Sequence, residues 1–123
     1  MNKTKILNIW CGFFNSKNLD GILQTYSSNG VLLATFNKDI LQGRDKIRPY
    51  FIDLFKKENL KVIFEPNCIV THLEEGYVIS GNYTFSFTEN GVLNQEDARY
   101  SYVVEMRGNQ FLIVNHHSSV RPK

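Results

Sequence analysis

The chain has 123 residues, with 14 Lys and Arg against 12 Asp and Glu, a net charge of +2 and a hydrophobic fraction of 42%. This length predicts one domain, spanning residues 1–123, and excludes separate cofactor and substrate lobes. The balanced charge and scattered basic residues exclude the basic stripe of a typical nucleic-acid binder. The aromatic content (nine Phe, six Tyr and one Trp) is enough to build a core, so we expect a folded chain.

The two cysteines and the N-terminal segment indicate the compartment. Cys11 and Cys68 lie far apart with no CxxC spacing, which predicts free thiols in a reducing environment rather than a disulfide scaffold or a zinc site. Residues 6–14 are typical of an amphipathic helix rather than a signal peptide, and no stretch approaches the ~20 apolar residues of a membrane span. We therefore expect a cytoplasmic protein without membrane contact.

Three helices are predicted in the first half of the chain. Apolar residues recur at three- and four-residue steps over 6–14, 19–26 and 47–55. Gly12 interrupts the first pattern and predicts close helix packing there. The second helix should end at residues 27–30, Ser-Ser-Asn-Gly. Asp45 is the predicted N-cap of the third, and Pro49 predicts a distorted first turn or a later start.

Strands dominate the rest of the chain. Short strands are expected over 31–36 and at 40–41, and four long ones over 61–73, 77–87, 99–106 and 111–117, joined by hairpins. Over 77–87, apolar and polar residues alternate, which predicts one dry face. Helices grouped before an antiparallel meander define the α+β class, and a twisted sheet of this kind can curve around the helices and enclose a pocket.

Few residues point to chemistry. His116 and His117 are adjacent, so in a regular strand only one of them can enter a site, and for either one a hydrogen-bonded structural role is favoured over catalysis. We expect neither a metal nor a cofactor, because His72 is the only other histidine and no nucleotide motif is present. Arg99 has two open interpretations: a surface cation paired with Asp97 or Glu105, or a guanidinium that binds a planar anion at a pocket mouth.

Three segments carry a resemblance to a known family: 43–47 (Gly-Arg-Asp-Lys-Ile), 96–99 (Glu-Asp-Ala-Arg) and, above all, 112–119 (Leu-Ile-Val-Asn-His-His-Ser-Ser). The chain resembles the nuclear transport factor 2-like superfamily, which includes ketosteroid isomerase and polyketide-cyclase-like proteins. Within it, the chain is similar to the association (hub) domain of calcium/calmodulin-dependent protein kinase II and its stand-alone bacterial relatives. The implied fold is a cystatin-like cone, with a curved antiparallel sheet wrapped around three N-terminal helices.

The resemblance also implies assembly and a pocket. Hub domains form dimers that stack into rings, and they hold a deep pocket rich in arginine and histidine. Arg99 and His117 match pocket positions of that family, whereas Tyr83 and Ser118 stand where arginines are expected and Asn115 replaces the first histidine of the final motif. We therefore expect a less cationic pocket. Kinase activity is not expected, because the chain contains no kinase lobe.

Our main hypothesis is a homodimer, with a ring-like oligomer as an option, that binds a small and optionally anionic ligand without catalysis. Its predicted polar anchors are Arg99 and His117. The predicted pocket walls are Trp10, Tyr50, Phe51 and Tyr83.

Two alternatives stay open. The first is a small pocket enzyme, an isomerase, cyclase or dehydratase acting on an apolar carbonyl compound, with His117 or Asp39 as base and Tyr50 or Arg99 as oxyanion partner. The short strand over 31–36, where ketosteroid-isomerase-like proteins carry a catalytic Asp, has no acid before Asp39. The second is a hub-like module that joins another protein's assembly.

Overall fold

Six strands form one sheet in the order β2-β1-β6-β5-β4-β3 in the computed structural model, which describes residues 2–123. The elements are α1 (Lys5–Asn15), α2 (Leu19–Gln24), β1 (Tyr26–Leu33), β2 (Ile40–Gln42), α3 (Arg44–Leu54), β3 (Glu58–His72), β4 (Gly76–Glu89), β5 (Val92–Arg107) and β6 (Gln110–Val120). The pairing of β1 with β6 is parallel, and the other pairings are antiparallel. The α+β class and the four long hairpin-linked strands are confirmed.

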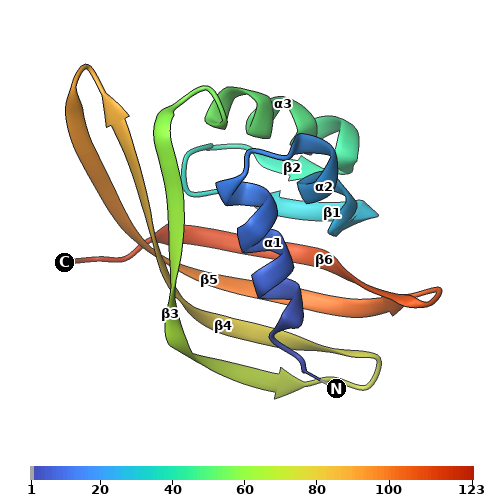
Figure 1. Ribbon diagram of the computed structural model, residues 1–123. Coiled ribbons are helices and arrows are strands. Elements are labelled where there is room, and N and C mark those ends of the chain that lie inside the picture. Colours follow the sequence, from blue (N-terminus) through green and yellow to red (C-terminus); the bar gives the residue numbers. More distant parts are fainter. Residues whose placement is uncertain (1) are drawn as a thin grey trace.

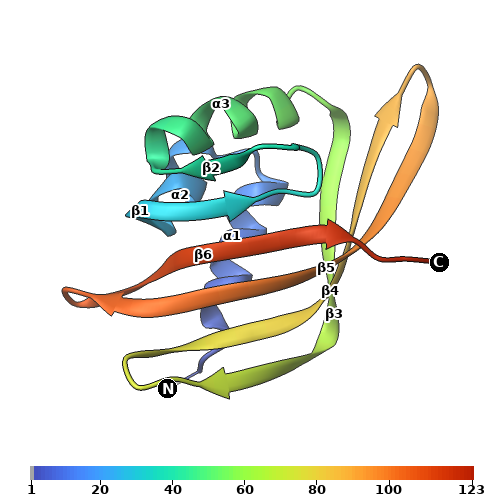
Figure 2. The ribbon, with the colours of Figure 1, turned by 180° about the vertical axis from the view of Figure 1, so that it is seen from behind.

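The sheet curves around α1, which lies across its concave side, while α3 lies beside β2 (Figure 1). Seen from behind, no helix covers the other side (Figure 2). We call the side toward α1 the inner face and the opposite side the outer face. The alternation predicted for 77–87 is seen in β4, where Tyr77, Ile79, Tyr83 and Phe85 are buried on the inner face.

Helix α1 is amphipathic as predicted, with Ile6, Leu7, Trp10 and Phe14 buried. Its C-terminal end is held to β3 because the Asn15 side chain accepts a hydrogen bond from Val62 N (2.8 Å) and donates one to Val62 O (3.1 Å). Such a paired contact with a strand backbone satisfies both polar atoms of the amide and fixes where the helix lies on the sheet.

The expected close packing at Gly12 is wrong. A Cβ atom at Gly12 would meet nothing within 4 Å, whereas one at Gly21 in α2 would lie 2.5 Å from the Phe13 ring of α1. The two helices therefore approach each other closely at Gly21, where the missing side chain leaves room for an aromatic ring.

Strand β1 begins at Tyr26, five residues before the predicted start. The Ser-Ser-Asn-Gly segment at 27–30 was expected to be a turn, but it belongs to this strand. The cause is tertiary: Tyr26 is in register with Ile113 of β6, and Ile113 N donates to Thr25 O (2.8 Å). Pairing with β6 thus overrides the turn preference of these residues.

Helix α3 starts at Arg44, earlier than predicted, and includes Pro49. Its N-cap is Gly43, with φ +87°, and not Asp45, which lies in the first turn. At its start, the amides of Lys46 and Ile47 both donate to the Gly43 carbonyl (3.1 Å each), a shared acceptor that is common at helix termini. Gly43 follows β2 and redirects the chain into α3. It does so with a positive φ, which glycine adopts without strain.

Within residues 2–123, no helix has both the length and the apolar character to cross a membrane. Cys11 and Cys68 are both free thiols and half-buried. The same part of the chain holds no cluster of three or more His, Cys, Asp or Glu side chains that could bind a metal ion.

Candidate functional site

The inner face of the sheet is occupied by a buried hydrogen-bonded network centred on His116, which is 2% exposed. Tyr26 Oη lies 2.9 Å from His116 Nδ1, and Tyr83 Oη lies 3.0 Å from His116 Nε2. Trp10 Nε1 donates to Tyr26 Oη (3.0 Å). The imidazole is therefore held at both nitrogens, between two phenols from β1 and β4, with α1 supplying a further donor.

The donor and the acceptor of each hydrogen bond in this network follow from the bond between Tyr83 and Ser118. Tyr83 donates its only proton to Ser118 Oγ (2.6 Å), so it must accept one from His116 Nε2. Nδ1 is then the acceptor, Tyr26 donates to it, and the Trp10 indole donates to Tyr26. Ser118 in turn is hydrogen-bonded to Thr35. The network is complete only with a neutral histidine that carries its proton on Nε2.

Burial sets the protonation states here. It lowers the pKa of His116 to about 3, with a smaller contribution from the neighbouring His117. Burial also raises the pKa of Tyr26 and of Tyr83 well above the usual range of a phenol. The Tyr102 ring stacks on His116, with ring centroids 3.9 Å apart at 16°. All these groups are neutral at physiological pH, so this interior is suited to rigid packing and not to proton transfer with a ligand.

The predicted pocket residues do not gather around one cavity. Trp10, Tyr83 and Phe51 are fully buried core side chains, and the Trp10 ring lies 6.3 Å from Tyr83 and 6.4 Å from Phe51 between ring centroids. Arg99 and His117 are exposed on the outer face, where Arg99 Nε donates to Ser119 Oγ (3.2 Å). Of the two interpretations of Arg99, this geometry is that of a surface cation.

The two remaining candidates lie elsewhere. Tyr50 lines a smaller hollow beside α3, and burial raises the pKa of its phenol. Asp39 is exposed and paired with Lys38 (3.0 Å). The residues named as base and oxyanion partner thus lie in three places: His117 and Arg99 on the outer face, Asp39 in the loop before β2, and Tyr50 on α3.

A β-bulge decides which of the two adjacent histidines points into the interior. Regular alternation from the buried Ile113 would place residues 115 and 117 on the inner face. In β6, however, Val114 is an extra residue, since Val103 pairs with Asn115 and Val104 pairs with Ile113. The bulge reverses the alternation after Val114, so that His116 points inward and His117 outward. A bulge of this kind has no signal in the local sequence.

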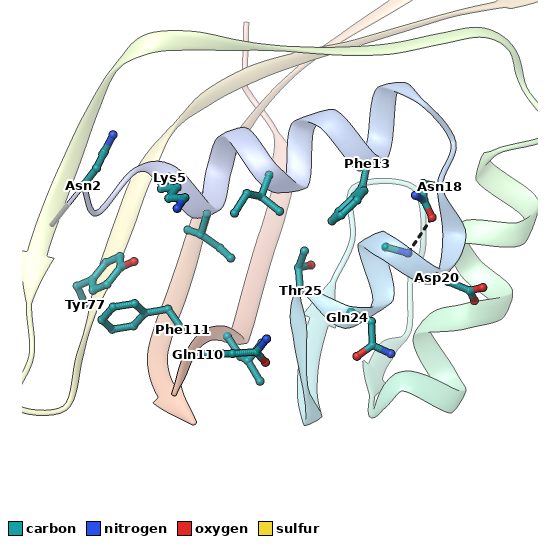
Figure 3. A pocket seen from close by; sticks show the side chains of 14 residues that line it. Asn2, Lys5, Phe13, Asn18, Asp20, Gln24, Thr25, Tyr77, Gln110 and Phe111 are labelled. Atoms are coloured by element: carbon teal, nitrogen blue, oxygen red, sulfur yellow. Dashed lines mark hydrogen bonds between the residues drawn. The ribbon is translucent and has the colours of Figure 1, made fainter. Parts of the chain in front are cut away.

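A hollow that none of these residues reaches lies between α1, α2 and the start of β6. It has a volume of about 770 Å³. We call it the α1–β6 groove. Figure 3 shows that Asn2, Lys5 and Tyr77 lie at one end and that Asn18 and Asp20 lie at the other. It is lined by Asn2, Lys5, Ile6, Ile9, Phe13, Asn18, Asp20, Gly21, Gln24, Thr25, Tyr77, Gln110, Phe111 and Leu112. None of the predicted site residues lines it.

Comparison with solved structures shows which proteins share this fold. Two solved structures share the fold at low identity: a ketosteroid isomerase-like protein of Erwinia carotovora (TM-score 0.80, 12% identity, covering 98% of this chain and 95% of that one), and a protein named as an aromatic ring hydroxylase from Novosphingobium aromaticivorans (TM-score 0.86, 11% identity, 98% and 87%). Two further structures share it: a Novosphingobium aromaticivorans protein described as nuclear transport factor 2-like with a cystatin-like fold, and a Salmonella enterica protein described as a nuclear transport factor 2-like superfamily protein. The fold of this chain is therefore the one that these proteins share.

A family model and one relative of higher identity assign the chain to a particular family. Residues 2–122 match the model of the calcium/calmodulin dependent protein kinase II association domain, and the chain belongs to this family. A Xanthomonas campestris protein assigned to the same association domains is 30% identical, with a TM-score of 0.87, over 98% of this chain and 86% of that one. No curated protein sequence matches the chain.

Proposed function

We propose that this protein is a homodimerising association module that presents a small-molecule groove and has no catalytic centre of its own. The observation that carries the proposal is the outer face of the sheet. The family to which the chain belongs is named for association, and this face is free of helices over all six strands.

The strand register aligns two neighbouring rows of side chains across this face. One row runs Ile40, Leu33, His117, Ser101, Ser80, Ile69, and the next runs Gln42, Val31, Asn115, Val103, Val78, Thr71. Neither row contains an Asp, Glu, Lys or Arg. Ile40 and Ile69, at the two ends of the first row, are 69% and 70% exposed. A surface with small polar residues in the middle, apolar residues around them and little charge suits an isologous contact with a second copy.

Binding is favoured over catalysis in this proposal. His116 already uses both ring nitrogens, and burial keeps it neutral, so it has no free lone pair to act as a base. The low-identity likeness to an isomerase-like protein and to a protein named as a hydroxylase concerns the fold. The pocket-enzyme alternative remains a prediction without a specific observation in its favour.

The test is a charge placed in the middle of the outer face. Ser101 bonds only to Ser80 across the sheet (Oγ–Oγ 3.0 Å), so Ser101→Arg should leave the fold intact while two arginines meet near the twofold axis. We expect sedimentation velocity to show a single-chain species. Ser86→Arg on β4, at the same exposure class but outside the two rows, is the matched control and should stay dimeric. An unchanged dimer in Ser101→Arg would refute this face as the interface.

A further inference from the structure

We infer that the α1–β6 groove binds an amphipathic monocarboxylate, an acid with an unbranched apolar chain, whose carboxylate lies at Lys5 and whose chain lies along α1. The inference rests on the ligand-binding half of the proposed function. The class of ligand follows from how charge and apolar surface are arranged in the groove.

The body of the groove is apolar. Ile6, Ile9 and Phe13 form a stripe along α1, at steps of three and four residues, that faces the groove. Phe111 and Leu112 of β6 lie opposite. The backbone beneath is already satisfied, since Thr25 O accepts Ile113 N (2.8 Å) and Thr25 Oγ1 donates to Ile22 O (2.6 Å). A ligand chain therefore meets side-chain carbon without leaving a buried backbone group unpaired.

The two ends of the groove differ in charge. Asp20, at one end, is paired with Arg48 (3.4 Å). Lys5, at the other end, has no acidic partner among residues 2–123. The groove therefore offers one uncompensated charge, and it is positive.

Polar donors surround that charge. Asn2 uses its Oδ1 to accept from Thr4 N (3.0 Å) and Thr4 Oγ1 (2.8 Å), which leaves its amide NH2 group for a ligand. The Tyr77 phenol lines the same end, where its ring packs edge-on against Phe111 (5.5 Å). A carboxylate suits this end because an ammonium, an amide and a phenol can all donate to it.

The dimensions select a chain rather than a compact ring. From Lys5 to Phe13 the helix rises by about 12 Å, which roughly matches the extended length of decanoate. A groove of about 770 Å³ is in the usual range for small-molecule sites. Each added methylene should tighten the dissociation constant about fourfold until the chain fills the groove.

The experiment is calorimetric titration of the full chain with decanoate, decanol and decylamine, each below its self-association concentration. We expect decanoate to bind one per chain and more tightly than the other two. Lys5→Glu should weaken decanoate at least roughly fivefold and reverse the preference toward decylamine. Lys61→Glu, an exposed lysine of β3 that makes the same change in net charge away from the groove, is its control and should leave the preference unchanged.

A second pair of variants tests the location of the chain. Ile9 is 38% exposed in the groove and Ile52 is 41% exposed on α3, outside it, so both should tolerate an aspartate. We expect Ile9→Asp to abolish decanoate binding and Ile52→Asp to leave it unchanged. Equal binding of all three alkyl compounds would overturn the monocarboxylate class but keep the groove as a ligand site. If none of them binds, both the inference and the ligand-binding half of the proposed function are wrong.

Discussion

At the scale of single residues, His116 and His117 show how one inserted residue decides a role. The sequence predicts that only one of the two enters the interior, and His116 is the one that does. The choice between them depends on the bulge at Val114, which arises from pairing with β5 and β1 and leaves no trace in the local pattern. The partners of His116, Tyr26 and Tyr83, are 90 and 33 residues away in sequence, so the network could not be inferred before the fold was known.

The buried His116 makes stability depend on pH. Its pKa is lowered from an ordinary 6.5 to about 3, so between these values the unfolded chain holds a proton that the folded chain does not. The free energy of unfolding should therefore fall as the pH drops below about 6.5, by at most about 1.4 kcal/mol per pH unit from this group. Urea unfolding at fixed protein concentration, between pH 7 and pH 4, measures this slope.

The matched variants are His116→Phe and His72→Gln. His116→Phe leaves Tyr26 and Tyr83 without their partner, so we expect it to cost roughly 2–5 kcal/mol at pH 7 and to remove this contribution to the slope. His72 is exposed at the end of β3, and its replacement should change neither. Equal slopes in the wild type and His116→Phe would show that another group carries the pH dependence.

At the scale of elements, the helices and strands with a strong apolar period were predicted from the sequence. The features that depend on contacts between elements were not. Helix α1 and strand β4 follow from their apolar spacing, because each buries most of one face. The polar start of β1 was missed, since only its pairing with β6 makes it a strand. Gly12 was singled out from its place in a helix, although the glycine that matters for helix packing is Gly21.

These two glycines give a paired prediction. Gly12→Ala should stabilise the protein by about 0.5–1 kcal/mol, because it raises helix propensity where a Cβ meets nothing within 4 Å. Gly21→Ala should instead destabilise it by roughly 1–3 kcal/mol, since its Cβ would lie 2.5 Å from the Phe13 ring. Thermal unfolding of the two variants beside the wild type checks both. A stabilising Gly21→Ala would mean that α1 and α2 separate without cost.

At the scale of the whole molecule, the sequence predicted the class of fold, but the residues that it named as pocket walls do not line the α1–β6 groove. A curved sheet around helices was expected to enclose a pocket, and the residues expected to line it were mostly aromatic. In the structure, Trp10, Tyr83, Tyr102 and their neighbours fill the interior by packing on one another. The α1–β6 groove lies instead between α1, α2 and the start of β6, and none of the predicted site residues lines it.

The proposed dimer surface and the proposed ligand groove lie on different sides of the molecule. The two rows without charged residues lie on the outer face. Helix α1, which lines the α1–β6 groove, lies on the opposite side of the sheet (Figures 1 and 2). A second copy on the outer face would therefore leave the groove open. We accordingly expect decanoate binding to be the same in the wild type and in Ser101→Arg.

Self-association through the outer face is the central claim, and the solution mass tests it most directly. One chain has a mass of 14.3 kDa. Light scattering across micromolar concentrations should give twice that mass, or a larger even multiple if dimers stack into a ring. A mass of one chain that persists at the highest concentration would contradict the proposal.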